Sequence, residues 1–146
     1  MIWLQASTAA TIPLGPFVDE TDCVTAEDGL TISQADVRLS KNGGDFAQKN
    51  GAAALVHDEN GWYPCGFDTT DTGTVGRLRI AVYESGALPV WHDCMVVPAN
   101  IYASLVGGSD YLLVDTLQIE GADATDTLLT QAAQALTNYD PATYAD

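Results

Sequence analysis

The alternation of apolar and polar positions is clearest in residues 76–97, which predict two antiparallel strands joined by a turn. In the first half, Leu78, Ile80 and Val82 occupy every second position, and the residues between them are mostly polar. Since successive side chains of a strand point to opposite faces, this alternation predicts one buried and one solvent-facing side. The second half, residues 90–97, is apolar at nearly every position, as expected where both faces are covered or where one face meets another protein.

Shorter strand patterns separated by turn residues precede this pair. Residues 30–40 alternate but change phase near Gln34, as a strand does at a β-bulge. Asn42 and Gly43 then predict a hairpin turn, because both tolerate a positive φ. A short, polar edge strand centred on Phe46 is expected to follow.

Two further strands are predicted before the central pair. Residues 52–56 form one short strand, and residues 58–61 form the turn after it. In the other, residues 62–67, Pro64 cannot donate to a strand ladder and therefore indicates an edge position or a bulge. Strands of about four to eight residues between closely spaced turns are typical of a sandwich or a small barrel.

The N-terminal residues 1–29 carry isolated apolar side chains among Thr, Pro, Gly and acidic residues. Pro13 and Pro16 exclude a regular central strand, so we expect an extended N-terminal arm with one or two short edge strands. Trp3 either packs into the core of its own domain or docks on a neighbouring subunit.

The pattern changes to that of a helix near residue 100. Asn100 can cap a helix of about two turns in residues 101–106, and Gly107 and Gly108 end it. Residues 110–119 are again strand-like.

The last segment predicts a second helix, capped by Asp123 or Thr125 and ended by the Asp140–Pro141 pair. Four residues on it recur at spacings of three, four and three, as in a coiled-coil seam of about two heptads. They are Leu129, Ala132, Leu136 and Tyr139. So short a seam is marginal in water unless it packs on its own domain or on copies of itself. We therefore expect an oligomerisation element or the start of a longer stalk.

Together these segments predict an all-β, mainly antiparallel β-sandwich, Ig-like or jelly-roll-like, with an extended N-terminal arm, a short helix near residue 100 and a C-terminal helix. A chain of 146 residues is long enough for one buried core and too short for two ordinary domains. The predicted parts are the arm (1–29), the sandwich module (30–120) and the helical oligomerisation element (121–146).

The chain is strongly acidic, with 20 Asp and Glu residues, five Lys and Arg residues and a formal net charge of −15. Such a field repels phosphate backbones, so we expect no nucleic-acid partner. A more general effect of the negative charge is solubility, since like-charged molecules repel one another.

The cysteines and the hydropathy indicate a protein made in a reducing cytosol. Cys23, Cys65 and Cys94 are odd in number and widely spaced, which indicates neither a disulfide framework nor a zinc cluster. Residues 1–17 have no basic segment and no continuous apolar core, so we expect no signal peptide. No run approaches the roughly 18 apolar residues of a membrane span, so we expect no membrane partner.

No common catalytic motif is present, and we expect neither enzymatic activity nor a metal or cofactor. His92 and Cys94 share one side of their strand while Asp93 points to the other, so the three do not form a nucleophile with its base. His57 precedes the turn residues 58–60, which could offer ligands to a metal, but such residues are common in turns for conformational reasons.

Arginines and aromatic residues are the candidates for surface recognition. Arg77 and Arg79 share a strand face, with Arg38 on a nearby strand, and they either pair with carboxylates across the strands or form a docking patch for an acidic neighbour. With two tryptophans, the candidate docking residues are Trp3, Arg77, Arg79 and Trp91.

Three aromatic residues also allow a different interpretation. Trp62, Tyr63 and Trp91 could form a platform on which a sugar stacks, although a tryptophan in a small sandwich is more often part of the core.

Three stretches together resemble a module found in structural proteins of tailed bacteriophages: LTISQADVRLSKNGGDFAQKN, HDENGWYPCGFDTTDTGTVGRL and ESGALPVWHDCMVVPANIYASLVGG. The module often lies near the start of tail-fibre or other virion-surface chains and is similar to the N-terminal β-sandwich adaptors of baseplate proteins. The resemblance covers residues 11–120 and brings no catalytic residues. YLLVDTLQIEG and NYDPAT resemble the connectors that lead from such a module towards repeats or stalks, but no receptor-binding domain follows within these 146 residues.

The resemblance implies a non-enzymatic virion protein, made in the host cytoplasm. We expect a tail-fibre or baseplate adaptor that docks on other virion proteins through its sandwich and forms a homotrimer or another homo-oligomer through its C-terminal helix. One alternative is a decoration or cement protein on the capsid surface, bound to the major capsid protein. Another is a carbohydrate-binding module built on the aromatic residues.

Overall fold

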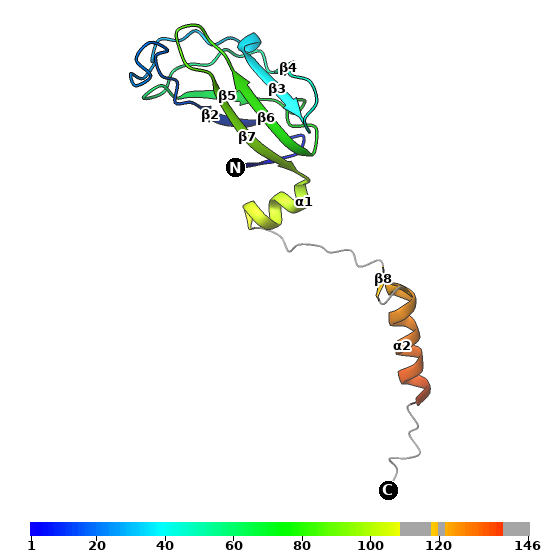
Figure 1. Ribbon diagram of the computed structural model, residues 1–146. Coiled ribbons are helices and arrows are strands. Elements are labelled where there is room, and N and C mark those ends of the chain that lie inside the picture. The colour runs from blue at the N-terminus through cyan, green and yellow to red at the C-terminus, as the bar shows by residue number, and fades with distance from the viewer. Residues whose placement is uncertain (109–117, 120–121, 139–146) are drawn as a thin grey trace. The chain divides into compact units, whose positions relative to one another are not determined.

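The computed structural model describes residues 1–108, 118–119 and 122–138, and the chain divides into two units (Figure 1). The first unit is Met1–Leu112 and the second is Leu113–Asp146. The first contains two β-sheets and a short helical segment, and the second contains a helix preceded by two very short strands.

A five-stranded sheet forms the larger part of the first unit. Its strands, in spatial order, are β1 (Ile2–Gln5), β7 (Val90–Val97), β6 (Gly76–Val82), β3 (Val37–Lys41) and β4 (Ala47–Gln48). The β1 strand runs parallel to β7, and the other neighbours are antiparallel, so the sheet is mixed. The predicted central pair is confirmed, with β6 and β7 joined over their whole length from the Gly76–Val96 pair to the Val82–Val90 pair.

The second sheet has two antiparallel strands, β2 (Ala10–Leu14) and β5 (Tyr63–Phe67). The two prolines of these strands, Pro13 and Pro64, lie opposite each other in the register. In a two-stranded sheet both strands are at an edge, where the missing N–H of proline is tolerated. The predicted edge position of the Pro64 strand is therefore confirmed.

Both sheets contribute side chains to a single core. The inner face of β6 lies at its centre, with Leu78, Ile80 and Val82 buried as the alternation predicts. Every strand of these two sheets except β4 adds buried residues, among them Leu4, Ile12, Leu14, Val37, Leu39, Tyr63, Cys65, Phe67, Cys94 and Val96. The first unit is thus a β-rich fold of two sheets that share one core.

The N-terminal residues do not form the predicted extended arm. Leu4, Ile12, Leu14 and Phe17 are buried in the shared core, and β1 and β2 belong one to each sheet. The predicted short edge strands are present, but burial of these apolar residues makes the segment part of the folded domain. Trp3 stays 40% exposed and is not a core residue.

Two predicted strand features are replaced by other structures. The phase change near Gln34 is a 3-10 turn (η1, Gln34–Asp36) rather than a β-bulge. The Asp36 carboxylate accepts hydrogen bonds from the backbone N–H and the hydroxyl of Ser33, at 2.8 and 2.6 Å, which holds the turn. Residues 52–56 form a loop, in which Leu55 is buried and its N–H donates to the Ile32 carbonyl.

The predicted tight turns are confirmed by their backbone angles. Asn42 and Gly43 have φ of 52° and 78°, and Asn60 and Gly61 have φ of 48° and 74°. Glycine is required at position 61 for a second reason, because a Cβ there would collide with the carbonyl oxygen of Phe17. The close approach lets the Phe17 N–H donate to the Gly61 carbonyl at 2.9 Å.

The helix predicted near residue 100 is present as α1 (Ala99–Tyr102) followed by a π-helical segment, η2 (Ala103–Gly107). Gly108, with φ of 60°, ends it as predicted. The predicted cap is wrong, because the helix begins one residue before Asn100 and the capping position is Pro98.

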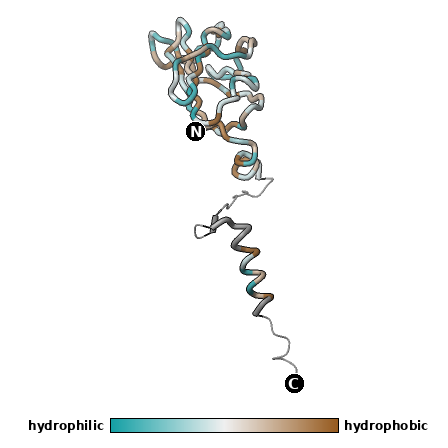
Figure 2. The backbone as a smooth tube through the Cα atoms, turned by 90° about the vertical axis from the view of Figure 1, so that its right-hand side faces the viewer, coloured by the Kyte–Doolittle hydropathy of each residue, from teal (hydrophilic) through white to brown (hydrophobic). Residues whose placement is uncertain are grey.

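The second unit contains α2 (Ala124–Asn138), preceded by β8 (Gln118–Ile119) and β9 (Ala122–Asp123). Hydrophobic and hydrophilic residues are interspersed along α2 (Figure 2). The predicted C-terminal helix is present as α2. Tyr139 of the predicted seam lies outside the described residues. Among the helices that the structure describes, none is both long and apolar enough to cross a membrane.

A buried lysine supports the loops beside the second sheet, and the sequence did not indicate it. Lys49 is 1% exposed, and its ammonium donates to the carbonyls of Gly51 and Gly66. Nearby, the buried carboxylate of Asp71 accepts from the backbone N–H groups of Asn50 and Gly51. These bonds satisfy polar groups that would otherwise be costly to bury.

We predict that Tyr63→Phe lowers the free energy of unfolding by about 1–3 kcal/mol, because two partly buried backbone groups lose a hydrogen-bond partner. The Tyr63 hydroxyl donates to the Glu27 carbonyl at 2.7 Å and accepts from the Leu30 N–H at 3.1 Å. Denaturant unfolding measures the change. The matched control is Tyr83→Phe, at a side chain that is 70% exposed; equal effects of the two substitutions would contradict the prediction.

Candidate docking face

The outward side of the five-stranded sheet brings the candidate docking residues together. Since Leu78 and Cys94 point into the core, their odd-numbered neighbours on β6 and β7 point outward. The register places Arg77 beside Met95, Arg79 beside Asp93, Ala81 beside Trp91, and Trp3 beside Met95. On the next strand, Arg38 lies beside Ala81. We call this set the docking face: Trp3, Arg38, Arg77, Arg79, Trp91, Asp93 and Met95.

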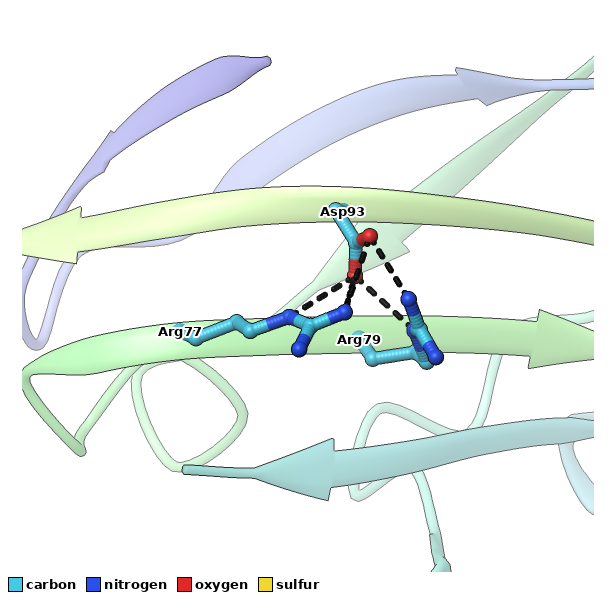
Figure 3. A network of polar contacts seen from close by, with 3 residues as sticks. All are labelled: Arg77, Arg79 and Asp93. Carbon is cyan, nitrogen blue, oxygen red and sulfur yellow. Dashed lines mark hydrogen bonds and ion pairs between the residues drawn. The ribbon is translucent and has the colours of Figure 1, made fainter. Parts of the chain in front are cut away.

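Arg77 and Arg79 both bind the carboxylate of Asp93 on the adjacent strand (Figure 3). Arg79 uses two nitrogens: its Nε lies 2.9 Å from Oδ1, and its Nη2 lies 2.8 Å from Oδ2. The Arg77 Nε and Nη2 donate at 3.1 to 3.2 Å. Cross-strand pairing with a carboxylate, one of the two predicted interpretations, is therefore confirmed.

This pairing shifts the pKa values of Asp93 and Arg79. Hydrogen bonds from Arg79 and then Arg77 lower the pKa of Asp93 far below its ordinary value. The same contacts raise the pKa of Arg79. All three groups are charged at neutral pH, and one carboxylate offsets only one of the two guanidinium charges. The cluster therefore has a net positive charge.

The sheet as a whole concentrates the few cations of the chain. Its five strands carry four of the five Lys and Arg residues and one of the 20 acidic residues, which gives them a net charge of +3. The rest of the chain then carries −18. Of the four cations, Lys41 turns away from the docking face and donates to the Thr70 carbonyl at 2.7 Å. The three arginines make the docking face the basic side of an acidic molecule.

A hollow of about 230 Å³ lies beside the arginines. It is lined by Ser40, Gly43, Gly44, Phe46, Arg77 and Arg79. The hairpin turn after β3 provides one wall, and the Arg38 Nη2 donates to the Phe46 carbonyl at 3.0 Å, which ties that wall to the sheet. The lining thus combines two cationic side chains with an aromatic residue.

Two tryptophans of the docking face are exposed to solvent. Trp3 on β1 is 40% exposed, and Trp91 on β7 is 65% exposed. Exposed tryptophans carry a large apolar area that binding would remove from water. All four residues predicted as docking candidates thus lie on one side of one sheet.

The three aromatic residues proposed as a sugar platform do not share a surface. Tyr63 is fully buried and packs edge-on against Phe17, with ring centroids 5.5 Å apart. Trp62 is half-buried and lies 6.3 Å from the ring of His92, on the side of β7 opposite Trp91. The platform interpretation is therefore wrong for these three residues taken together.

His92 makes a contact between two segments of the first unit. Its Nε2 accepts a hydrogen bond from the Gly15 N–H at 3.3 Å, which links β7 to the residue after β2. Burial lowers the pKa of His92 and raises the pKa of the Cys94 thiol to about 11. A neutral thiol is a weak nucleophile, and Asp93 faces the other side of the sheet. The three residues do not form a catalytic group.

The other histidine, His57, lies beside a carboxylate. His57 Nε2 lies 2.9 Å from Oδ1 of Asp28, and the same oxygen accepts from the Gly61 N–H at 3.1 Å. Over the residues that the structure describes, no three His, Cys, Asp or Glu side chains come together as metal ligands would.

No protein-family model matches the chain, and no curated protein and no solved structure is significantly similar to it.

We predict that the Asp93 cluster gives the protein a stability that depends on pH. A carboxyl whose pKa is lowered in the folded state stabilises the fold above its ordinary pKa of 3.8 and loses that effect as the pH falls through the lower value. Asp93→Asn should be less stable than the wild type above about pH 5, with the difference shrinking in stronger acid. Thermal unfolding at several pH values measures this. Asp45→Asn, at an exposed carboxylate, is the control, and a difference from wild type that does not change with pH would refute the prediction.

Proposed function

We propose that this chain is a non-enzymatic structural protein of a tailed-phage virion, most simply a tail-fibre or baseplate adaptor. Its two sheets would form a sandwich-like module that docks on other virion proteins, and α2 would join copies of the chain. The observation that carries the proposal is that the two units present different kinds of surface. One unit presents a basic, tryptophan-bearing sheet face, and the other presents a helix with exposed leucines.

The exposed leucines of α2 favour a homo-oligomer. Leu129 and Leu136 are 63% and 79% exposed, and Ala132 between them is exposed as well. The three residues are separated by three and four positions, the spacing with which helices pack in a coiled coil. A helix of 15 residues is marginal in water by itself. Burial of this seam between three copies would stabilise α2, and a trimer suits a fibre.

The composition of the docking face favours a protein partner. Trp and Arg are the residues that most often dominate binding energy in protein interfaces. Trp3, Trp91 and the two paired arginines occupy neighbouring strands of a rigid sheet, so little side-chain freedom would be lost on binding.

The alternatives have less support from the described residues. A capsid-decorating protein would use a free N-terminal arm as a clasp, whereas Leu4, Ile12 and Leu14 hold this segment in the core. A carbohydrate-binding module would need the aromatic platform, from which Tyr63 is removed by burial.

We predict that the full-length chain is a trimer and that Leu129→Gln with Leu136→Gln makes it a monomer, since the seam loses its apolar contacts. Sedimentation equilibrium measures the mass, which should fall to about one third. Leu128→Gln is the matched control, because Leu128 is 59% exposed on the same helix but lies outside the seam. A monomeric wild type at high concentration, or an equal effect of the control, would rule out the helical trimer.

A further inference from the structure

We propose that the docking face binds an acidic segment of a partner protein, with one carboxylate of that segment seated in the hollow beside Arg77 and Arg79. This inference rests on the proposed function, since it names the chemistry of the partner that the docking face recognises. The hollow has the size for a single side-chain carboxylate and the apolar carbons next to it, which would contact Phe46.

The charge distribution restricts which partner can bind and in which orientation. The strands of the sheet carry +3, and the rest of the chain carries −18. The net charge of the rest of the chain repels an acidic partner, whereas the arginines of the sheet attract it. At physiological ionic strength charges are screened beyond about 8 Å, so the local contact decides the sign of the interaction. A short acidic segment that covers only the sheet therefore meets a favourable field.

The Asp93 contact leaves the arginines charged and holds them in place. All the side-chain hydrogen bonds described for Arg77 and Arg79 go to Asp93, and one carboxylate leaves one positive charge uncompensated. A guanidinium is planar and rigid, and it can donate two parallel hydrogen bonds to one carboxylate. Because Asp93 already holds the side chains of Arg77 and Arg79 in place, a second carboxylate binds without the entropy cost of ordering them.

A protein segment fits this face better than a nucleic acid does. Phosphates also bind arginine, but a nucleic acid is an extended polyanion that would pass over the acidic surroundings of the sheet. Trp3 and Trp91 offer apolar area on both sides of the charged cluster. Apolar contacts that exclude water around a central charged contact are a feature of protein interfaces.

The test uses the full-length chain and hexaglutamate as probe, in about 150 mM salt so that long-range repulsion is screened. NMR signals of the Arg77 and Arg79 Nε–H groups report binding, and hexaglutamine is the uncharged comparison. We expect hexaglutamate, but not hexaglutamine, to shift both signals. Arg79→Gln should weaken the affinity at least about fivefold. Lys41→Gln is the matched control, because it removes the same charge from the sheet at a side chain that turns away from the docking face.

A second variant separates binding from stability. Asp93→Asn keeps one side-chain oxygen that can accept from the arginines but removes the negative charge that competes with the probe. It should therefore tighten hexaglutamate binding about threefold or more, although it destabilises the fold. A variant that merely disturbed the sheet would lose both stability and affinity for hexaglutamate.

Three results would overturn the inference. The first is equal binding of hexaglutamate and hexaglutamine, or no shift with either. The second is equal loss of affinity in Arg79→Gln and Lys41→Gln. The third is tighter binding of a hexathymidine oligonucleotide than of hexaglutamate, which would assign the face to nucleic acid. If hexaglutamate fails while the seam variants still convert a trimer to a monomer, the acidic partner is wrong and the oligomeric adaptor stands.

Discussion

Burial of the inner face of β6 is the constraint on which the rest of the first unit depends. Leu78, Ile80 and Val82 contact a core that both sheets share, so they fix which way the strand faces. A slip of one residue would turn every side chain of the strand to the opposite side. The same burial therefore places Arg77 and Arg79 on the outside.

The neighbouring strand is fixed by the same rule. Cys94 and Val96 of β7 are buried, and this places Asp93 on the outside, opposite Arg79. The charged cluster is thus a consequence of core packing, and it needs no loop to position it. Sites on strands are held more rigidly than sites on loops, which suits a face that docks.

The sequence predicts this part of the fold because its pattern is local. The alternation in β6 and the turns at Asn42–Gly43 and Asn60–Gly61 need only the residues themselves. It also predicts that Arg77 and Arg79 share a face. Asp93 was not identified as their common partner, because that contact depends on the register between two strands.

The predictions from sequence that were wrong also have physical explanations. In the N-terminal segment, prolines argue against a central strand, but Pro13 lies in a strand that has an open edge. Residues 52–56 look like a strand because they are apolar, whereas only Leu55 is used, as an anchor for a loop. Lys49 gave no signal in the sequence, since burial of a lysine depends on carbonyls from distant residues.

We propose a virion protein in which a sheet docks and a helix oligomerises, and the location of the chain in a particle tests this proposal most directly. A cryo-EM reconstruction of the proposed phage particle would show whether the two-sheet domain is present and where it lies. We predict density at the tail tip, baseplate or fibre base, in threes or sixes, with the docking face against an acidic neighbour. Copies spread over the capsid at local symmetry axes, or no copies in the particle, would contradict it.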